Sequence, residues 1–370
     1  MKAPHHVCCI LFGDIRFDSR SSKFLQTLSS HGYNTTVIMI PEPSAASYPT
    51  GLAIHPAQVT RTLPTKIRFL IFYWKALFIA LRSRATIFLA SDLYSLPTAW
   101  SASVLTGAKL IYDSRELYSS IAALHKRPLT QRFWTWCERI FSPRADSIIT
   151  VNNSLAQFLR ENHPKQRMYV VRNIPHKQTV SDRSLLRRRL NIPPGEKIVL
   201  YQGGLQEGRG IGILLSIAPI LPDAAFVFLG SGVLRHSIKE ASRKSPNVHL
   251  LDAVPMSELI TYTAGANIGW CIIENHGLSY YYSLPNKLFE YIMAGIPIVG
   301  STFPEIKKII DLYNVGITVD PLDTNGLIDS LRMLLTDDGL SARYAENCRI
   351  AAEVLTWQNE SGFLLEAFSF

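Results

Sequence analysis

The feature that most constrains this chain is a repeated alternation of short, almost wholly apolar segments with longer amphipathic ones. In the first half, apolar segments lie at 7–13, 35–40, 86–91, 109–114 and 147–152. Strands of a parallel sheet are buried on both faces, so they are apolar throughout and do not alternate with polar residues. The pattern therefore predicts a parallel sheet covered by helices on both faces.

The second half restarts this alternation after a polar, basic segment at 176–197. Its apolar segments lie at 197–203, 225–232, 247–252, 268–273, 296–301 and 316–320. We therefore expect an α/β protein of two doubly wound, Rossmann-like domains that face each other across a cleft, and 370 residues suffice for both. Ligands of such domains bind just beyond the carboxyl ends of the strands.

Charge and cysteine content narrow the class of partner. The formal net charge is +9, which favours nucleic acid, an anionic membrane surface or phosphorylated small molecules. Five cysteines without a CxxC pair indicate reduced, mostly buried thiols and a cytoplasmic protein. The apolar run near the N-terminus is too short for a signal peptide, and the stretch 69–81 is too short to span a membrane.

The segment SLPNKLFEYIMAGIPIVG, residues 283–300, predicts a helix with a lysine near its start. Ser283 is the expected N-cap, Pro285 comes early, and Gly295 ends the helix. A cation in the first turn opposes the helix dipole by about 0.3–1 kcal/mol. Lys287 is explained if an anion docks at the same place; the alternative is a lysine that is simply solvated.

A second cation stands at an equivalent strand-to-helix turn. In YQGGLQEGRGI, residues 201–211, Arg209 and Gly210 precede an apolar helix where a glycine would let a phosphate approach the backbone. The glycine-rich FLGSG, residues 228–232, is a third such turn, although turns of this kind are also common packing devices. Glu290 follows Lys287 by three residues, so it either pairs with that lysine or accepts hydrogen bonds from a ribose.

These three segments, in this order and spacing, resemble the second domain of a family 4 glycosyltransferase of the GT-B fold. The first half is similar to that family's first domain, in FDSRSSKFLQTLSSHGYNTTVI and in residues 91–117 and 145–175. The resemblance covers nearly the whole chain. It implies an acceptor-side domain at 1–176, a donor-side domain at 177–355 and a C-terminal helix at 356–370 that crosses back to the first domain.

The resemblance also implies the chemistry. Arg209 and Lys287 would be the catalytic cations that hold the donor diphosphate and neutralise the leaving nucleoside diphosphate, while Glu290 binds the ribose. The two cations would take the place of a metal, so a retaining transfer from a nucleoside-diphosphate sugar is expected with no metal and no cofactor. The remaining donor-binding candidates are Gly13, Gly203, Gly204, Gly232, Val254, Asn286 and Leu288, with backbone near Asp252 contouring the base.

The sequence departs from the family pattern at three places. Many relatives carry a second glutamate where this chain has Tyr282, and Glu274 lies too far upstream to match it without an insertion. The more common arginine of the phosphate strand is Gly204 here, and Arg115 stands where relatives often have histidine. These departures concern the sugar and acceptor contacts more than the diphosphate.

Candidate acceptor residues end strands of the first domain. Asp14 and Asp92 could touch an acceptor, which we expect to be a glycan or a lipid-linked molecule of polysaccharide or glycoconjugate synthesis. Asp113 and Glu116 form either an acid–base pair or, with Arg115 beside them, a plain ion pair. Scattered histidines, at 5, 6, 125, 163 and 276, show no metal-ligand spacing.

The segment PTKIRFLIFYWKALFIALRSR, residues 64–84, surrounds a band of aromatic and aliphatic residues with five cations. It predicts an interfacial helix that lies on an anionic membrane, on the cytoplasmic face, and presents a lipid-linked acceptor. The alternative is a helix that is apolar because it covers a sheet.

Three other functions remain open from sequence alone. A sugar-nucleotide epimerase shares this architecture but needs acid and base residues around the sugar, and no carboxylate–histidine set matches. A non-catalytic sugar-nucleotide-binding protein is suggested by Tyr282 and Gly204, and opposed by Arg209 and Lys287. Nucleic-acid binding is disfavoured, because aromatic and basic residues are not interleaved on a strand platform.

Overall fold

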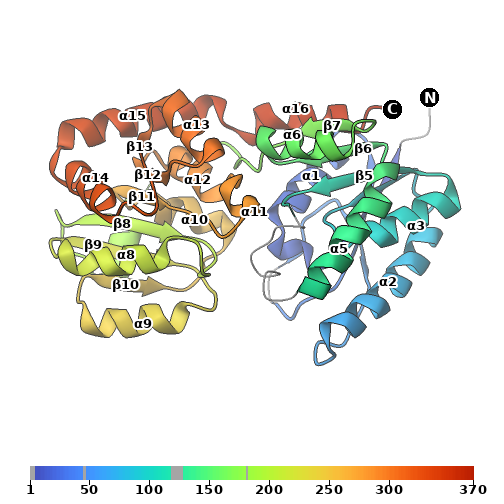
Figure 1. Ribbon diagram of the computed structural model, residues 1–370, viewed down its shortest axis with the longest axis horizontal. Coiled ribbons are helices and arrows are strands. Elements are labelled where there is room, and N and C mark those ends of the chain that lie inside the picture. The colour runs from blue at the N-terminus through green and yellow to red at the C-terminus, as the bar shows by residue number, and fades with distance from the viewer. Residues whose placement is uncertain (1–4, 45–46, 118–127, 181) are drawn as a thin grey trace. The chain divides into compact units, whose positions relative to one another are not determined.

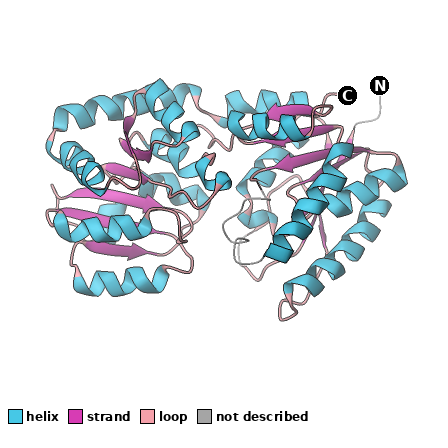
Figure 2. Cartoon of the chain, viewed as in Figure 1, coloured by secondary structure: helices cyan, strands magenta, loops and turns pink. Residues whose placement is uncertain are grey.

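The computed structural model describes residues 5–44, 47–117, 128–180 and 182–370. The chain divides into two compact units, the first made of Met1–Asn173 with Glu360–Phe370 and the second of Ile174–Asn359. Each unit holds a parallel sheet flanked by helices (Figure 2). The expected α/β architecture of two doubly wound sheets is therefore confirmed.

The sheet of unit 1 has seven strands in the order β3-β2-β1-β4-β5-β6-β7, with all neighbours parallel. The strand order reverses between β1 and β4, and ligands of doubly wound sheets bind at the carboxyl ends of the strands where such a reversal occurs. The strands are β1 (His6–Leu11), β2 (Asn34–Met39), β3 (Ala53–Pro56), β4 (Ile87–Ala90), β5 (Lys109–Ser114), β6 (Ser147–Thr150) and β7 (Arg167–Val170).

The helices of unit 1 cover this sheet (Figure 1). They are α1 (Ser19–Ser30), α2 (Thr65–Arg82), α3 (Leu96–Thr106), α5 (Pro128–Phe141) and α6 (Asn153–Asn162), with short helices η1 (Ile15–Phe17) and η3 (Ser142–Arg144). The strands β3 and β7 were not among the apolar segments of the sequence: β3 is exposed at three of its four residues, and β7 begins with the exposed Arg167. No helix in the described part of the chain is both long and apolar enough to cross a bilayer.

The sheet of unit 2 has six parallel strands in the order β10-β9-β8-β11-β12-β13, so its order reverses between β8 and β11. The strands are β8 (Lys197–Gln202), β9 (Ala224–Leu229), β10 (Val248–Leu251), β11 (Ile268–Cys271), β12 (Ile298–Ser301) and β13 (Gly316–Val319). The helices are α7 (Leu185–Leu190), α8 (Ile211–Ile217), η4 (Ala218–Ile220), α9 (Arg235–Lys244), α10 (Met256–Thr263), α11 (Leu278–Tyr281), α12 (Asn286–Ala294), α13 (Pro304–Tyr313), α14 (Thr324–Thr336) and α15 (Asp338–Val354).

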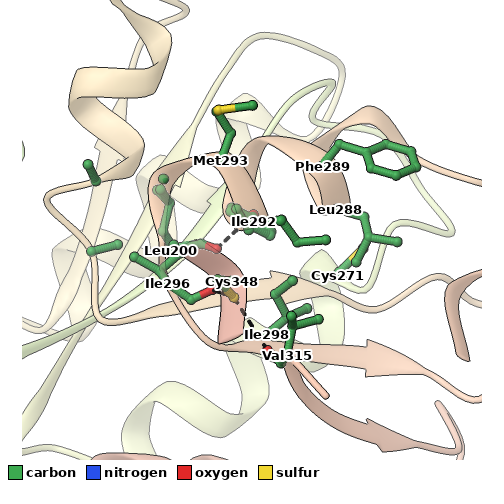
Figure 3. Packing of buried hydrophobic residues seen from close by; sticks show 14 of the residues in the cluster. Leu200, Cys271, Leu288, Phe289, Ile292, Met293, Ile296, Ile298, Val315 and Cys348 are labelled. Carbon is green, nitrogen blue, oxygen red and sulfur yellow. Dashed lines mark hydrogen bonds between the residues drawn. The ribbon is translucent and has the colours of Figure 1, made fainter. Parts of the chain in front are cut away.

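Both faces of this second sheet are buried, as the apolar strands require. Along β8, Ile198 and Leu200 belong to one apolar cluster, while Val199 and Tyr201 belong to the cluster on the opposite face. The first cluster packs α12 and α15 against the sheet (Figure 3), where the Cys348 thiol points to the carbonyl oxygen of Ile296 at 3.3 Å. All five cysteines are free and buried, as expected.

The last helix, α16 (Trp357–Ala367), carries the chain into the segment assigned to unit 1. Glu360 is buried, and its carboxylate accepts hydrogen bonds from both the backbone N–H and the guanidinium of Arg172. Near its end the carbonyl oxygen of Ala367 accepts a hydrogen bond from the Ser147 hydroxyl of β6. These contacts hold residues 360–370 against the sheet of unit 1.

Candidate active site

The donor candidates of unit 2 gather at the carboxyl ends of β8 and β9. The turn after β9 packs directly on the turn after β8: the Leu205 N–H donates to the Ser231 carbonyl at 2.8 Å. A Cβ atom at Gly232 would lie 2.4 Å from the carbonyl oxygen of Leu205, and the φ of Gly232 is +153°. This close approach of two backbones explains Gly232 by packing, without any ligand.

Lys287 is the second residue of α12, and its side chain is buried at this end of the sheet. The residue is 7% exposed, and its ammonium nitrogen finds no hydrogen-bond partner among the described residues. The nitrogen lies 3.5 Å from the centre of the Tyr201 ring, and a Cβ at Gly203 would lie 3.8 Å from the lysine Cε. The solvated-lysine alternative is therefore wrong.

The pKa of Lys287 is lowered to about 7, mainly by burial and in smaller part by the charge of Arg209. The expected cap of the helix is also wrong: Pro285 is the N-cap, while the Ser283 hydroxyl donates back to the Tyr280 carbonyl. At the start of α12, therefore, a desolvated ammonium lies beside backbone N–H groups that no side chain caps. A bound anion would stabilise both the buried ammonium and the uncapped N–H groups.

Glu290 lies one turn further along α12, and its carboxylate accepts a hydrogen bond from the side-chain amide of Gln202. The Gln202 carbonyl oxygen in turn accepts from the Thr263 hydroxyl at 2.7 Å, which fixes the orientation of the amide. Among the described residues the Lys287 nitrogen has no hydrogen-bond partner, so the lysine–glutamate ion pair considered from sequence is not hydrogen-bonded. The ribose-binding role of Glu290 stays a prediction.

Arg209 is half-buried on the loop between β8 and α8. Its guanidinium lies over the ring of Tyr280, 5.2 Å from the ring centre, and makes no hydrogen bond or ion pair within the described residues. The ring of Tyr280 stacks on His276 at 5.8 Å. Gly208 has a φ of +76°, and a Cβ there would be 2.8 Å from the Tyr280 ring, so the loop closes tightly on this aromatic pair.

The backbone of this loop is tied down by Glu274, which comes from the end of β11. The Glu274 N–H donates to the Gly208 carbonyl at 3.0 Å, and its carboxylate accepts from the Gly210 N–H at 3.1 Å. The expectation that a phosphate approaches the backbone at Gly210 is therefore corrected, because the protein's own carboxylate already occupies that N–H. Arg209 itself remains available.

The other donor candidates lie nearby but contribute differently. Leu288 is fully buried in the core, and its N–H donates to the Pro285 carbonyl, so its side chain faces away from any ligand. Asn286 and Gly204 are exposed, and Val254 packs partly against the core. Asp252 forms a largely exposed ion pair with Arg235 at 2.8 Å. Their donor-binding roles stay predictions.

In unit 1, Asp113 and Arg115 are occupied by a buried ion network at the end of β5. The Asp113 carboxylate accepts from Arg20 at 2.8 Å and from Arg115 at 2.9 Å. Arg115 also donates to Asp18 at 2.5 Å and to the Ser21 hydroxyl at 2.6 Å. This is the plain ion pair considered from sequence, and Asp113 has no exposed surface with which to touch an acceptor.

The remaining acceptor candidates lie in different environments. The Asp14 carboxylate is enclosed by Arg16 and by the Glu42 N–H, and it caps η1. Gly13 follows β1 and accepts a hydrogen bond from the Ile40 N–H. Glu116 is exposed and makes contacts of its own. Asp92 follows β4 at the point where the strand order reverses, and burial raises its pKa.

Four side chains that contact the candidate residues or their loop could not be identified from sequence: Tyr201, Gln202, Tyr280 and Glu274. Tyr201 and Gln202 end β8, and their position at the end of an apolar strand was the available signal. Glu274 was set aside because of its spacing, yet folding brings it to Gly210. Among the described residues, no three His, Cys, Asp or Glu side chains are arranged as metal ligands.

Comparisons with known families match both units. Residues 23–174 match the profile described as Glycosyltransferase Family 4, and residues 196–337 match Glycosyl transferases group 1. The D-inositol 3-phosphate glycosyltransferase of Corynebacterium urealyticum is 25% identical over 267 residues, which is 66% of this chain and 60% of that protein. The putative colanic acid biosynthesis glycosyl transferase WcaI of Escherichia coli is 23% identical over 45% of this chain and 43% of that protein. The matches thus span about half the length of these relatives.

Solved structures show the same fold at low identity. Sucrose-phosphate synthase from Thermosynechococcus elongatus superposes with a TM-score of 0.80 at 15% identity, covering 98% of this chain and 97% of that chain. The HepE protein of Anabaena, solved in complex with UDP-glucose, gives a TM-score of 0.75 at 14% identity, covering 98% of both chains. At such identities the likeness concerns the fold alone.

Proposed function

Because this chain belongs to the family 4 glycosyltransferases, we propose that it transfers a sugar from a nucleoside-diphosphate sugar to a glycan or lipid-linked acceptor. The observation that carries the proposal is the Lys287 ammonium, which is buried, has no hydrogen-bond partner in the described part of the chain and feels the charge of Arg209. A second cation near a desolvated one is unfavourable in the free protein. A diphosphate placed between them would relieve both the repulsion and the desolvation.

The same two cations account for the chemical step. As the bond between the sugar and the diphosphate breaks, negative charge builds on the leaving phosphate. Preorganised cations in a water-poor site stabilise that charge more in the transition state than in the ground state. Arg209, held by Tyr280 and by the loop that Glu274 secures, would meet the outer phosphate. We propose transfer with retention and without a metal, as the family resemblance implies, in polysaccharide or glycoconjugate synthesis.

The relatives support a nucleotide sugar as the donor. HepE was solved with UDP-glucose, and the curated relatives are named as glycosyltransferases. In this chain the ribose would meet Glu290, whose carboxylate is oriented by Gln202. The turn residues from Asp252 to Val254 would line the base.

Two measurements test the proposal. The first is thermal stabilisation by UDP, GDP, ADP and the corresponding nucleotide sugars, which identifies the donor. The second is the turnover of Lys287→Met and Arg209→Ala, with Lys308→Met, a change at an exposed lysine of α13, as the control. Each site variant should lose roughly 10²–10³-fold in turnover, or about 2–4 kcal/mol of transition-state stabilisation. The proposal is refuted if no nucleoside diphosphate stabilises the protein, or if nucleotides bind but no sugar is released or transferred.

A further inference from the structure

Unit 1 exposes two apolar stripes on neighbouring helices. On α2 the stripe consists of Ile67, Leu70, Trp74, Phe78 and Leu81, with Trp74 66% and Leu70 57% exposed. The spacing of three or four residues places them on one side of the helix. The opposite side of α2 supplies Phe72, Ala76 and Ala80 to the core. The helix therefore covers the sheet with one face and leaves a second apolar face exposed.

The second stripe is on α5 and consists of Leu129, Phe133, Trp136 and Ile140, which are between 47% and 78% exposed. Both helices pack against α3 (Figure 1), through the Tyr73 to Ser101 hydrogen bond on the α2 side and the Trp100 to Phe141 ring contact on the α5 side. Sequence periodicity predicted an interfacial segment at 64–84 alone; the structure adds α5 beside it. We call the two stripes together the apolar face.

Cations surround the apolar face, and acids do not. Lys66, Lys75 and Arg82 of α2 are exposed, as are Arg132 and Arg139 of α5. The residues of α2, α3 and α5 include one acid, Glu138. Its carboxylate accepts a hydrogen bond from the buried Tyr112 hydroxyl at 3.0 Å, and burial raises its pKa to about 7. These helices therefore present positive charge that no exposed carboxylate on them neutralises.

This combination selects one class of occupant. A second copy of the chain would bring an identical set of cations against the first, which like charges oppose. Nucleic acid would satisfy the charge, and its bases could stack on the exposed tryptophans, but it would leave the exposed leucine and isoleucine side chains in contact with water. An anionic bilayer accommodates both the apolar side chains and the cations, since aromatic and aliphatic side chains enter its interface while Lys and Arg contact lipid phosphates. We propose that unit 1 docks on anionic membranes through the apolar face.

The apolar face is connected to the ligand-binding edge of the unit 1 sheet. Phe12 and Tyr94 follow β1 and β4, the strands between which the strand order reverses. Phe12 contacts Phe69 of α2 at 5.9 Å, and Tyr94 contacts the buried Trp134 of α5 at 4.8 Å. Trp134 in turn contacts Phe133 of the apolar face at 5.1 Å. A membrane-anchored acceptor would reach this edge along aromatic side chains. That inference about the acceptor rests on the proposed function, whereas membrane docking does not.

Vesicle flotation of the full chain tests the docking surface without measuring activity. We expect binding to phosphatidylcholine vesicles that contain phosphatidylglycerol, much weaker binding to phosphatidylcholine alone, and loss of binding in high salt. The combined variant Lys66→Gln, Arg132→Gln and Arg139→Gln should lower the partition coefficient about 100-fold, because each such cation contributes about fivefold. The pair Trp74→Ser and Trp136→Ser should lower it at least about tenfold.

Matched controls lie on unit 2. Lys239→Gln, Arg243→Gln and Lys308→Gln remove the same charge from exposed positions, and Leu312→Ser with Leu322→Ser removes exposed apolar side chains. Both controls should bind vesicles as the wild type does. The proposal is overturned if the wild type binds neither vesicle, if the controls lose as much binding as the variants of the apolar face, or if the charge variants change RNA binding while no vesicle is bound. Failure of sugar transfer would leave these results unaffected.

Discussion

The ammonium nitrogen of Lys287 lies 3.5 Å from the centre of the Tyr201 ring and forms no hydrogen bond with the described residues. An aromatic face compensates only part of the cost of taking a charge out of water. The lysine is therefore partly compensated when the site is empty. The first two predictions follow from this pair.

Replacing Lys287 with methionine should raise the free energy of unfolding by about 1–3 kcal/mol below pH 7, since a buried cation becomes an apolar side chain of similar length. The folded pKa is about 7, against a reference value of 10.5, so the unfolded chain binds more protons between these values. The lysine's contribution to stability therefore rises with pH across that window, and the gain from the substitution shrinks. Urea denaturation at several pH values checks this, with Lys308→Met unchanged throughout. A variant less stable than the wild type at every pH would contradict it.

Nucleotide affinity should depend on the protonation of Lys287. A bound diphosphate favours the charged lysine and raises its pKa, so binding above pH 7 takes up a proton. Affinity should then fall with rising pH, by up to about tenfold per unit. Calorimetry with UDP in two buffers of different ionisation enthalpy measures the proton uptake. Arg209→Ala should bind more weakly and keep this dependence, because Lys287 is still present; absence of proton uptake in the wild type would refute the linkage.

Glu274 should act by holding the Arg209 loop. Glu274→Ala leaves the Gly210 N–H without its acceptor, which should lower stability by about 1–3 kcal/mol and turnover by about 10–100-fold as Arg209 shifts. Glu274→Gln keeps an oxygen acceptor and should stay within about threefold of the wild type. Turnover and nucleotide affinity of both variants distinguish the roles. Equal damage from the two substitutions would indicate that the negative charge itself is needed.

Asp92→Asn should be neutral or stabilising near neutral pH. Burial raises the pKa of Asp92, so ionising it in the folded protein opposes folding as pH rises above its ordinary value of 3.8. Asparagine retains the oxygen that accepts the Ser95 N–H at 2.8 Å. In thermal denaturation from pH 4 to pH 7, the stability of the variant relative to the wild type should increase with pH. A variant that loses stability across this range would show that the ionised carboxylate is stabilising.

Chelation should leave sugar transfer essentially unchanged, because Arg209 and Lys287 would supply the positive charge that a divalent ion supplies elsewhere. Turnover before and after EDTA treatment is the measurement. Loss of most activity, restored by Mg²⁺ or Mn²⁺, would assign that charge to a metal.

Much of the architecture could be predicted from local sequence. The apolar segments at 197–203 and 225–232 became β8 and β9, because a strand buried on both faces has no polar side to alternate with. The edge strands β3 and β7 escaped detection because β3 is mostly exposed and β7 begins with the exposed Arg167, so neither reads as an apolar segment. The placement of Lys287 near a helix start was also visible, whereas the cap of that helix was not, because the Ser283 hydroxyl donates back to Tyr280 of α11.

The sequence by itself determined the two sheets, the family and the helix turn on which Lys287 and Glu290 lie, because periodicity and spacing act between residues close in the chain. Only the tertiary structure decided that the Tyr201 ring covers the Lys287 ammonium and that the Glu274 carboxylate accepts the Gly210 N–H. It also decided that Asp113 forms ion pairs with Arg20 and Arg115. Most of these partners are 60 to 95 residues apart in the sequence. Burial and pairing at such separations depend on how the elements pack, and no local pattern records them.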